Sequence, residues 1–117
     1  MSLREEIEQA IADHAAWKTR FRDFVNGRVE LDAATVGLPN HCLFGKWLEK
    51  EGERMLLPKE AHDEIYALHA EFHRVAAETI KKKNSGDLNG AMQYLTANGA
   101  FGQASAALVQ RMLKLKL

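Results

Sequence analysis

The residues best suited to chemistry are His69 and His73, two histidines four positions apart in a segment predicted to be helical. Side chains at positions i and i+4 of a helix lie one above the other, so both imidazoles could reach a single ion. Leu68, Phe72 and Val75 place the pair on an apolar face that should point inward. Because neutral imidazoles in a core leave ring donors to satisfy, a metal ion that takes one nitrogen from each would relieve that cost.

His14 and Cys42 are the two residues that could complete such a site. His14 lies in an apolar helical stripe, seven residues after Ile7 and seven before Phe21, and we expect it to point into the core. Cys42 opens a short predicted helix, whose N-terminus is expected to lower the thiol pKa and favour the thiolate. Taken singly, each residue is more typical of an ordinary core position than of a metal ligand. Together with His69 and His73 they form a Cys-His₃ set, which suits tetrahedral Zn²⁺, although ligand type alone also allows Fe²⁺ or Co²⁺.

Two further histidines are candidates of lower rank. His62 lies seven residues before His69, about 10.5 Å along a helix axis, which is too far for both to bind one ion. We therefore assign it to the first turn of its helix or to the surroundings of the site. His41 adjoins Cys42 and would replace one of the four ligands if the chain there ran differently.

Helical periodicity dominates the chain and predicts an all-α fold, a four-helix bundle with three long helices and one short helix or irregular connection. The expected helices cover about 3–26, 43–49, 58–83 and 88–116, with Gly27 ending the first and Asp87 capping the last. Residues 28–41 are predicted to form a loop with room for one helical turn. On the last helix, Gly99 and Gly102 should either allow close packing or mark a kink. Its inward face is expected to hold Leu88, Ala91, Met92, Leu95, Gly102, Ala106, Val109, Met112 and Leu113.

The composition limits the remaining possibilities. The 117 residues suit one domain (1–117), and the balance of 16 basic and 16 acidic residues gives no overall field for nucleic acid or anionic membranes. A single cysteine excludes an internal disulfide. The polar start of the chain predicts no signal peptide, and no apolar run reaches membrane length, so we expect a cytoplasmic protein.

The order of these motifs resembles the bacterial chemoreceptor zinc-binding domain family, known as CZB. The matching elements are His14 followed by Trp17, the segment Cys42-Leu-Phe-Gly-Lys-Trp47, and the pair His69 and His73. The family pattern has a histidine followed closely by an aromatic residue, then Cys-x-apolar-Gly-x-apolar, then His-x-x-x-His. The one looseness is that the aromatic residue stands three positions after His14. The resemblance covers essentially the whole chain.

This resemblance implies a four-helix domain that binds Zn²⁺ through His14, Cys42, His69 and His73. Domains of this family work as homodimers fused to chemoreceptor signalling regions or diguanylate cyclases, whose output follows zinc occupancy or oxidation of the zinc-bound cysteine. We therefore expect a sensory or regulatory module with such a region as its output, and the apolar last helix is a candidate dimer face. The alternative is a helical dimerisation module in which zinc is purely structural.

Three rival functions fit the sequence less well. A zinc hydrolase of the HExxH type needs a glutamate where Ala70 stands, and Glu71 falls about 200° around the helix from His69. Ferritin-type di-iron bundles use inward glutamates and Glu-x-x-His pairs, and no glutamate stands three before His14, His69 or His73. An interaction bundle with ordinary core histidines would need four coincidences. We expect no enzymatic activity.

Overall fold

The computed structural model describes residues 2–27, 42–96 and 98–115, which form five α-helices and no strand. The helices are α1 (Leu3–Val25), α3 (Leu43–Arg54), α4 (Lys59–Asn84), α5 (Leu88–Tyr94) and α6 (Ala100–Leu113). The predicted all-α bundle is confirmed. The predicted loop over 28–41, including His41, lies outside the described residues.

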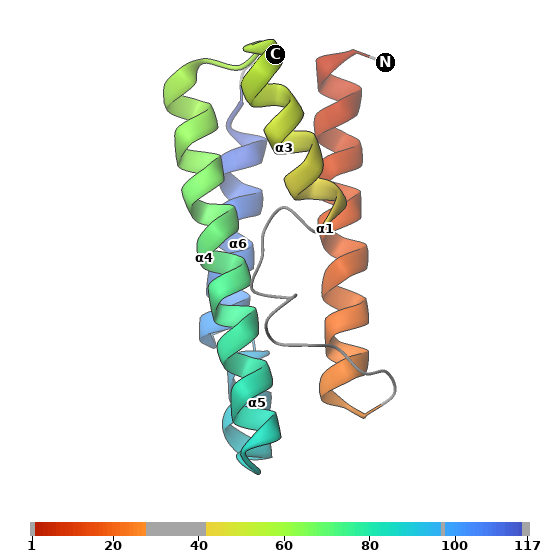
Figure 1. Cartoon of the computed structure of the whole chain (residues 1–117), viewed down its shortest axis with the longest axis vertical. Coiled ribbons are helices and arrows are strands. Elements are labelled where there is room, and N and C mark those ends of the chain that lie inside the picture. Colours follow the sequence, from red (N-terminus) through yellow and green to blue (C-terminus); the bar gives the residue numbers. More distant parts are fainter. Residues whose placement is uncertain (1, 28–41, 97, 116–117) are drawn as a thin grey trace.

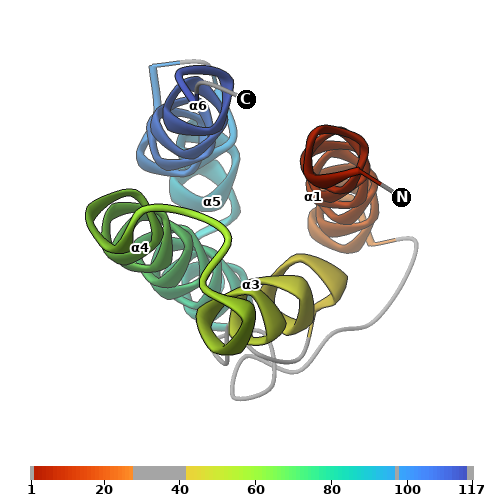
Figure 2. The same cartoon turned by 90° about the horizontal axis from the view of Figure 1, so that it is seen from above.

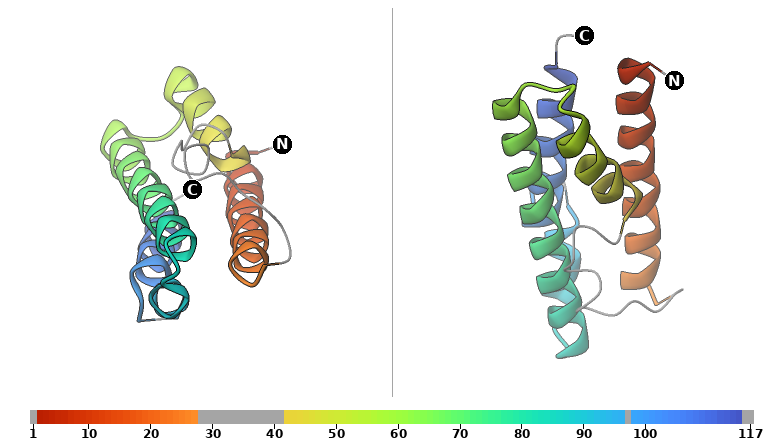
Figure 3. Two further views of the ribbon diagram at one scale, coloured as in Figure 1. Left: turned by 60° about the horizontal axis from the view of Figure 1, so that its bottom comes forward. Right: turned by 45° about the horizontal axis from the view of Figure 1, so that its top comes forward.

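The helices form an elongated bundle of 44 × 24 × 20 Å with α1, α3, α4 and α6 at its four corners. Seen along its length, α3 lies between α1 and α4, and α6 lies on the other side of α4 (Figure 2). The shorter α3 occupies only the end of the bundle where α1 begins, and α5 continues the column of α6 toward the opposite end (Figure 1). Two further views show α3 running obliquely from α4 toward α1 (Figure 3). None of the helices described is long and apolar enough to span a membrane.

Local sequence explains the ends of α1. Ser2 accepts a hydrogen bond from the backbone N–H of Glu5, and the Glu5 side chain accepts one from the Ser2 backbone, which completes a capping box. The helix stops before Gly27, whose φ of +84° is the left-handed conformation that glycine adopts most easily. The expected extent of this helix is therefore close to the observed one.

The short helix is longer than its sequence indicated, since α3 continues to Arg54 rather than ending near residue 49. Gly52, expected in a link, lies inside the helix, where a Cβ atom would come within 3.2 Å of the His62 Nε2 atom. A glycine here lets α3 approach α4 closely. Pro58 precedes the first turn of α4 as its N-cap instead of lying within that turn.

The prediction of one continuous helix over about 88–116 is wrong, because α5 and α6 are separate helices. A Cβ atom at Gly99 would lie 2.1 Å from the Gln93 carbonyl oxygen and 2.6 Å from that of Tyr94, so this turn requires glycine. The break also changes the helical phase. The inward residues of α6 are Phe101, Ser105, Leu108 and Met112; the first three lie one position before the predicted Gly102, Ala106 and Val109, while Met112 is confirmed.

The buried apolar residues separate into two clusters along the bundle. The first, which we call the α5-side cluster, contains Phe21, Phe24, Val25, Phe72, Val75, Ala76, Ile80, Ala91 and Phe101. The second, the α3-side cluster, contains Ile7, Ala10, Phe44, Leu48, Leu57, Ile65, Leu108 and Met112. On α1, α4 and α6 the buried residues between these two clusters are polar: His14, His69 and Ser105, with His73 directly after Phe72 of the α5-side cluster.

Candidate metal centre

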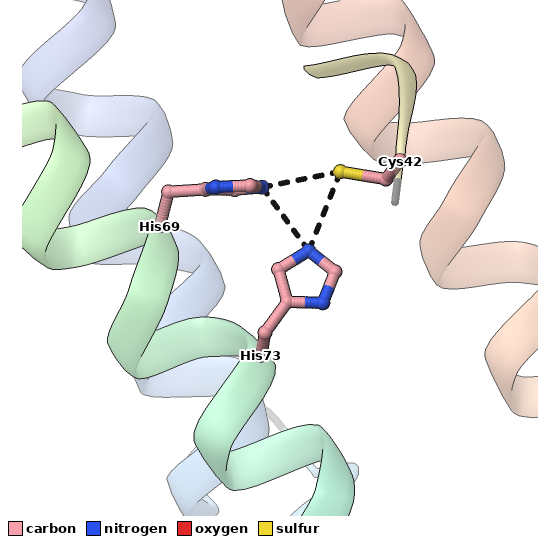
Figure 4. A group of neighbouring side chains, drawn as sticks. All are labelled: Cys42, His69 and His73. Atoms are coloured by element: carbon pink, nitrogen blue, oxygen red, sulfur yellow. Dashed lines mark hydrogen bonds between the residues drawn. The ribbon is translucent and has the colours of Figure 1, made fainter. Parts of the chain in front are cut away.

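Cys42, His69 and His73 bring three potential metal donors together (Figure 4). The Cys42 Sγ atom lies 3.3 Å from His69 Nε2 and 3.4 Å from His73 Nε2. The two Nε2 atoms are 3.1 Å apart. Of the described residues, these form the group of His, Cys, Asp and Glu side chains whose donor atoms converge closely enough to hold one ion.

Two helices position these donors in different ways. His69 and His73 are one turn apart on α4, and this places both imidazoles on the side that faces α3. Cys42 is the N-cap residue of α3, and its Sγ accepts a hydrogen bond from the backbone N–H of Gly45 at 3.3 Å. The thiol is therefore held at the end of α3, over the pair of rings (Figure 4).

The spacing of the three donors fits a zinc ion. With bond lengths of about 2.3 Å to sulfur and about 2.05 Å to nitrogen, tetrahedral geometry sets ligand separations of about 3.6 Å for sulfur–nitrogen and about 3.3 Å for nitrogen–nitrogen. The observed separations of 3.3, 3.4 and 3.1 Å lie close to those values. The mixed thiolate and imidazole set also favours zinc over Mg²⁺ or Ca²⁺.

Burial controls the protonation of this cluster. His69 is 1% exposed, and burial, together with the neighbouring rings of His73 and His14, lowers its pKa to about 3. The pKa of the Cys42 thiol is raised, mainly by burial, although the Gly45 N–H acts in the opposite direction. The expectation that the helix N-terminus lowers this pKa is wrong for the metal-free thiol, because desolvation outweighs that hydrogen bond. His69 is therefore neutral near pH 7, and the Cys42 thiol carries a proton that a metal ion must displace.

His14 is buried beside this group but is not one of the three converging residues. Its ring lies edge-on to Phe72, with centroids 4.5 Å apart, and its Nε2 atom is 3.0 Å from the Ser105 Oγ atom. Burial lowers its pKa to about 4, with smaller contributions from Lys18 and His73. The predicted inward orientation of His14 agrees with this position, while its role as the fourth ligand stays a prediction.

Aromatic rings enclose the cluster. Trp17 lies edge-on to His73 with centroids 5.0 Å apart, and Phe44 lies against His69 at 4.7 Å. These are the aromatic residues that follow His14 and Cys42 in the sequence motifs. They exclude water from the imidazoles, which strengthens any electrostatic interaction there.

The two residues judged unsuitable for metal binding lie elsewhere. The His62 Nε2 atom donates a hydrogen bond to the Leu48 carbonyl oxygen at 2.9 Å, so His62 joins α4 to α3 away from the cluster. Glu71 is on the outer side of α4, where it pairs with Arg74. Ser105 is the residue that the sequence pattern missed, because the predicted phase of the last helix placed its neighbour Ala106 inward.

A second, partly buried polar group, here called the carboxylate cluster, lies toward the C-terminal end of α3 and contains Glu6, Glu51 and Arg54. The Glu51 side chain is fully buried and accepts hydrogen bonds from Arg54 Nη2 at 2.7 Å and from the Leu57 backbone N–H at 2.9 Å. Arg54 also forms two hydrogen bonds to Glu6 on α1, at 2.7 and 3.2 Å. The cluster fixes this end of α3 against α1 and the α3–α4 link.

The comparisons with known proteins assign the chain to a family. No curated protein and no solved structure matches the chain. A family model, described as the chemoreceptor zinc-binding domain, matches residues 14–80, which is more than half of the chain and spans all four predicted ligands. The resemblance seen in the sequence motifs is confirmed, and the chain belongs to the chemoreceptor zinc-binding domain family.

Proposed function

We propose that this chain is a non-catalytic sensory module that binds one Zn²⁺ through Cys42, His69 and His73, with His14 as fourth ligand. The observation that carries the proposal is the convergence of one sulfur and two nitrogen atoms within 3.4 Å of one another. His14 supports a fourth position because it is 4% exposed and lies close enough to His69 and His73 to affect pKa values. Four protein ligands leave no open coordination position, as in structural zinc sites.

The mechanism follows from how the ligands are distributed. When bound, Zn²⁺ supplies a cross-link between α1, α3 and α4. Cys42 is the single ligand on α3, at its N-terminal end, whereas the opposite end is held by the carboxylate cluster and by the hydrogen bond from His62 to Leu48. Loss of the Cys42 ligand would therefore release the N-terminal end of α3 first, and movement of that end is the proposed signal.

Oxidation offers a second way to break the same link. A hypochlorous acid molecule would convert the Cys42 thiolate to a sulfenic acid and release chloride (RS⁻ + HOCl → RSOH + Cl⁻). The product has lost the thiolate that a metal needs. We propose that a chemoreceptor signalling region or a diguanylate cyclase reads the resulting change, and that the module acts as a homodimer in the cytoplasm.

Zinc stoichiometry by native mass spectrometry, combined with hydrogen exchange, tests this function. We expect one zinc per chain, lost on oxidation or in Cys42→Ala, with faster exchange over residues 43–50 when zinc is lost. Asp87→Ala is the matched control because it removes the N-cap side chain of α5, which accepts from the Gly90 N–H, away from the donors. Zinc bound by Cys42→Ala as tightly as by the unchanged chain would overturn the proposal. Equal protection of residues 43–50 from hydrogen exchange with and without zinc would contradict the proposed signal and leave zinc with a purely structural role.

A further inference from the structure

Ser105 on α6 is a buried polar residue that the family match does not include, since that match ends at residue 80. Its side chain is 1% exposed and lies between Phe101 and Leu108, both completely buried. A hydroxyl in such surroundings costs free energy unless it is hydrogen-bonded. Its Oγ atom lies 3.0 Å from the Nε2 atom of His14, a residue on α1.

This contact restricts how His14 can bind a metal. A ring nitrogen that is hydrogen-bonded to a hydroxyl cannot coordinate an ion at the same time, so in this orientation only Nδ1 is available. Metal-binding histidines characteristically donate their other ring N–H to a fixed acceptor, which sets the tautomer and the ring orientation. Ser105 Oγ is placed to be that acceptor.

We infer that Ser105 is a positioning residue of the zinc site, which accepts a hydrogen bond from His14 Nε2–H and leaves Nδ1 as the metal-binding nitrogen. The inference rests on the proposed role of His14 as fourth ligand. His69 and His73 present Nε2 to the common centre, so His14 would differ from them in the nitrogen it uses. The hydrogen bond also joins α6 to the site, in addition to the three helices that carry ligands.

Nuclear magnetic resonance of the full chain with ¹⁵N-labelled histidine and bound ¹¹³Cd²⁺ tests the choice of nitrogen. We expect a ¹¹³Cd–¹⁵N coupling at Nδ1 for His14 and at Nε2 for His69 and His73, with the His14 Nε2 carrying the proton. A coupling at Nε2 of His14 would overturn the inference while leaving the four-ligand site intact. No coupling at either nitrogen of His14, or unchanged zinc affinity in His14→Ala, would instead remove His14 from the ligand set.

Substitutions at Ser105 test the positioning role. Ser105→Ala should weaken zinc binding by about 10–100-fold, the usual effect of removing a hydrogen-bond partner of a ligand. Ser105→Thr keeps the hydroxyl and should restore most of the affinity. Thr79→Val is the matched control, because it removes a buried hydroxyl that donates only to the Val75 carbonyl on its own helix. Affinities are measured by competition with a chromophoric chelator on protein shown to be folded by circular dichroism.

The outcome that contradicts this role is a Ser105→Ala protein that binds zinc as tightly as the unchanged chain. A matching loss of affinity in Thr79→Val would also contradict it, since that would point to general loosening of the core. Failure of the unchanged chain to bind zinc at all would count against the proposed function and not against this contact.

Discussion

The two buried polar groups near the ends of α3 satisfy their polar atoms in different ways. The carboxylate cluster contains opposite charges, and Glu51 is matched by Arg54 and by a backbone N–H. The zinc cluster of Cys42, His69 and His73 contains one thiol and two imidazoles, all of which can act as lone-pair donors to a cation. Most polar atoms of the first group have partners within the protein, although the Arg54 Nε atom has none among the described residues. A group of the second kind is completed by a metal ion.

Under the proposed function, this difference would separate structural support at one end of α3 from sensing at the other. The carboxylate cluster should hold the C-terminal end of α3 under all conditions that leave its charges intact. The zinc cluster should hold the N-terminal end only when metal is present and the thiolate is reduced. Glu51 lies nine positions after Cys42, about 13.5 Å along the helix axis, so a change at one end of α3 should have little effect on the other.

The largest expected effect comes from removing a zinc ligand. Changes around a zinc ligand cost about 10–100-fold in affinity, so loss of the ligand itself in His69→Ala should cost more than about 100-fold. In His69→Ala, most of the stabilisation by zinc should also be lost, so adding zinc should no longer raise the melting temperature. His62→Ala is the control, because His62 is a histidine of the same helix outside the cluster. Equal zinc affinity in His69→Ala and the unchanged chain would show that the cluster of Cys42, His69 and His73 does not bind the metal, and so does not differ from the carboxylate cluster in this respect.

Breaking the carboxylate cluster should reduce stability without changing metal binding. Glu51→Ala removes the buried acceptor of the Leu57 N–H and one of the two carboxylates that bind Arg54, which keeps Glu6, and we expect a loss of about 1–3 kcal/mol in the free energy of unfolding. Glu51→Gln keeps an acceptor and should cost less. Urea unfolding with and without zinc measures both losses. A Glu51→Ala loss that differs strongly between the two conditions would show that the ends of α3 are coupled.

Acid should affect the two groups in different pH ranges. In metal-free protein the folded-state pKa values of His14 and His69 are about 4 and about 3, below the ordinary 6.5, so the unfolded chain binds protons more readily. Stability should therefore fall as the pH drops from about 6.5 toward 4, by about 3 kcal/mol for His14 alone. The pKa of Glu6 is lowered, mainly by its hydrogen bond to Arg54, so its contribution should be lost only below its ordinary value of 4.5. Free energies of unfolding measured across this pH range test whether the histidine contribution is lost before that of Glu6. A free energy that stays constant between pH 6.5 and 4.5 would contradict this prediction.

The smallest expected effect is the release of about one proton when zinc binds at pH 7. Burial keeps His14 and His69 neutral, while the raised pKa of Cys42 keeps its thiol protonated until metal displaces the proton. Calorimetric titrations in buffers of different ionisation enthalpy count these protons. Release close to zero would mean that the thiolate exists before metal binds, and release above two would mean that the imidazoles are charged.

Much of the site could be predicted from the sequence because its strongest part is local. The spacing of His69 and His73 on one helix determines their proximity without knowledge of the rest of the chain. Cys42 required the motif around it, since no short-range rule brings an N-cap residue of one helix to the side of another. The predicted direction of the Cys42 pKa shift was wrong. The helix N-terminus, which lowers the pKa, can be seen in the sequence, whereas the burial that raises the pKa depends on the tertiary structure.

Ser105 could not be found because the prediction carried one helical phase through the last part of the chain. Periodicity assigns inward positions correctly only while a helix continues, and the turn at Gly99 shifts most of them by one residue. The Asn98-Gly99 pair is a turn signal, but Gly99 was interpreted as a site of close packing or a kink within one continuous helix. Long-range contacts such as the one between His14 and Ser105 depend on that phase.

The division of the core into two apolar clusters has a consequence for how the molecule opens. The α3-side cluster and the α5-side cluster are separated by the polar residues at the level of His14, His69 and Ser105. Because the buried apolar residues form two separate clusters, we expect the half that contains α3, in the absence of zinc, to unfold subglobally at a lower free energy. With zinc bound, the ion joins the helices at the boundary, and both halves should unfold as a single cooperative unit.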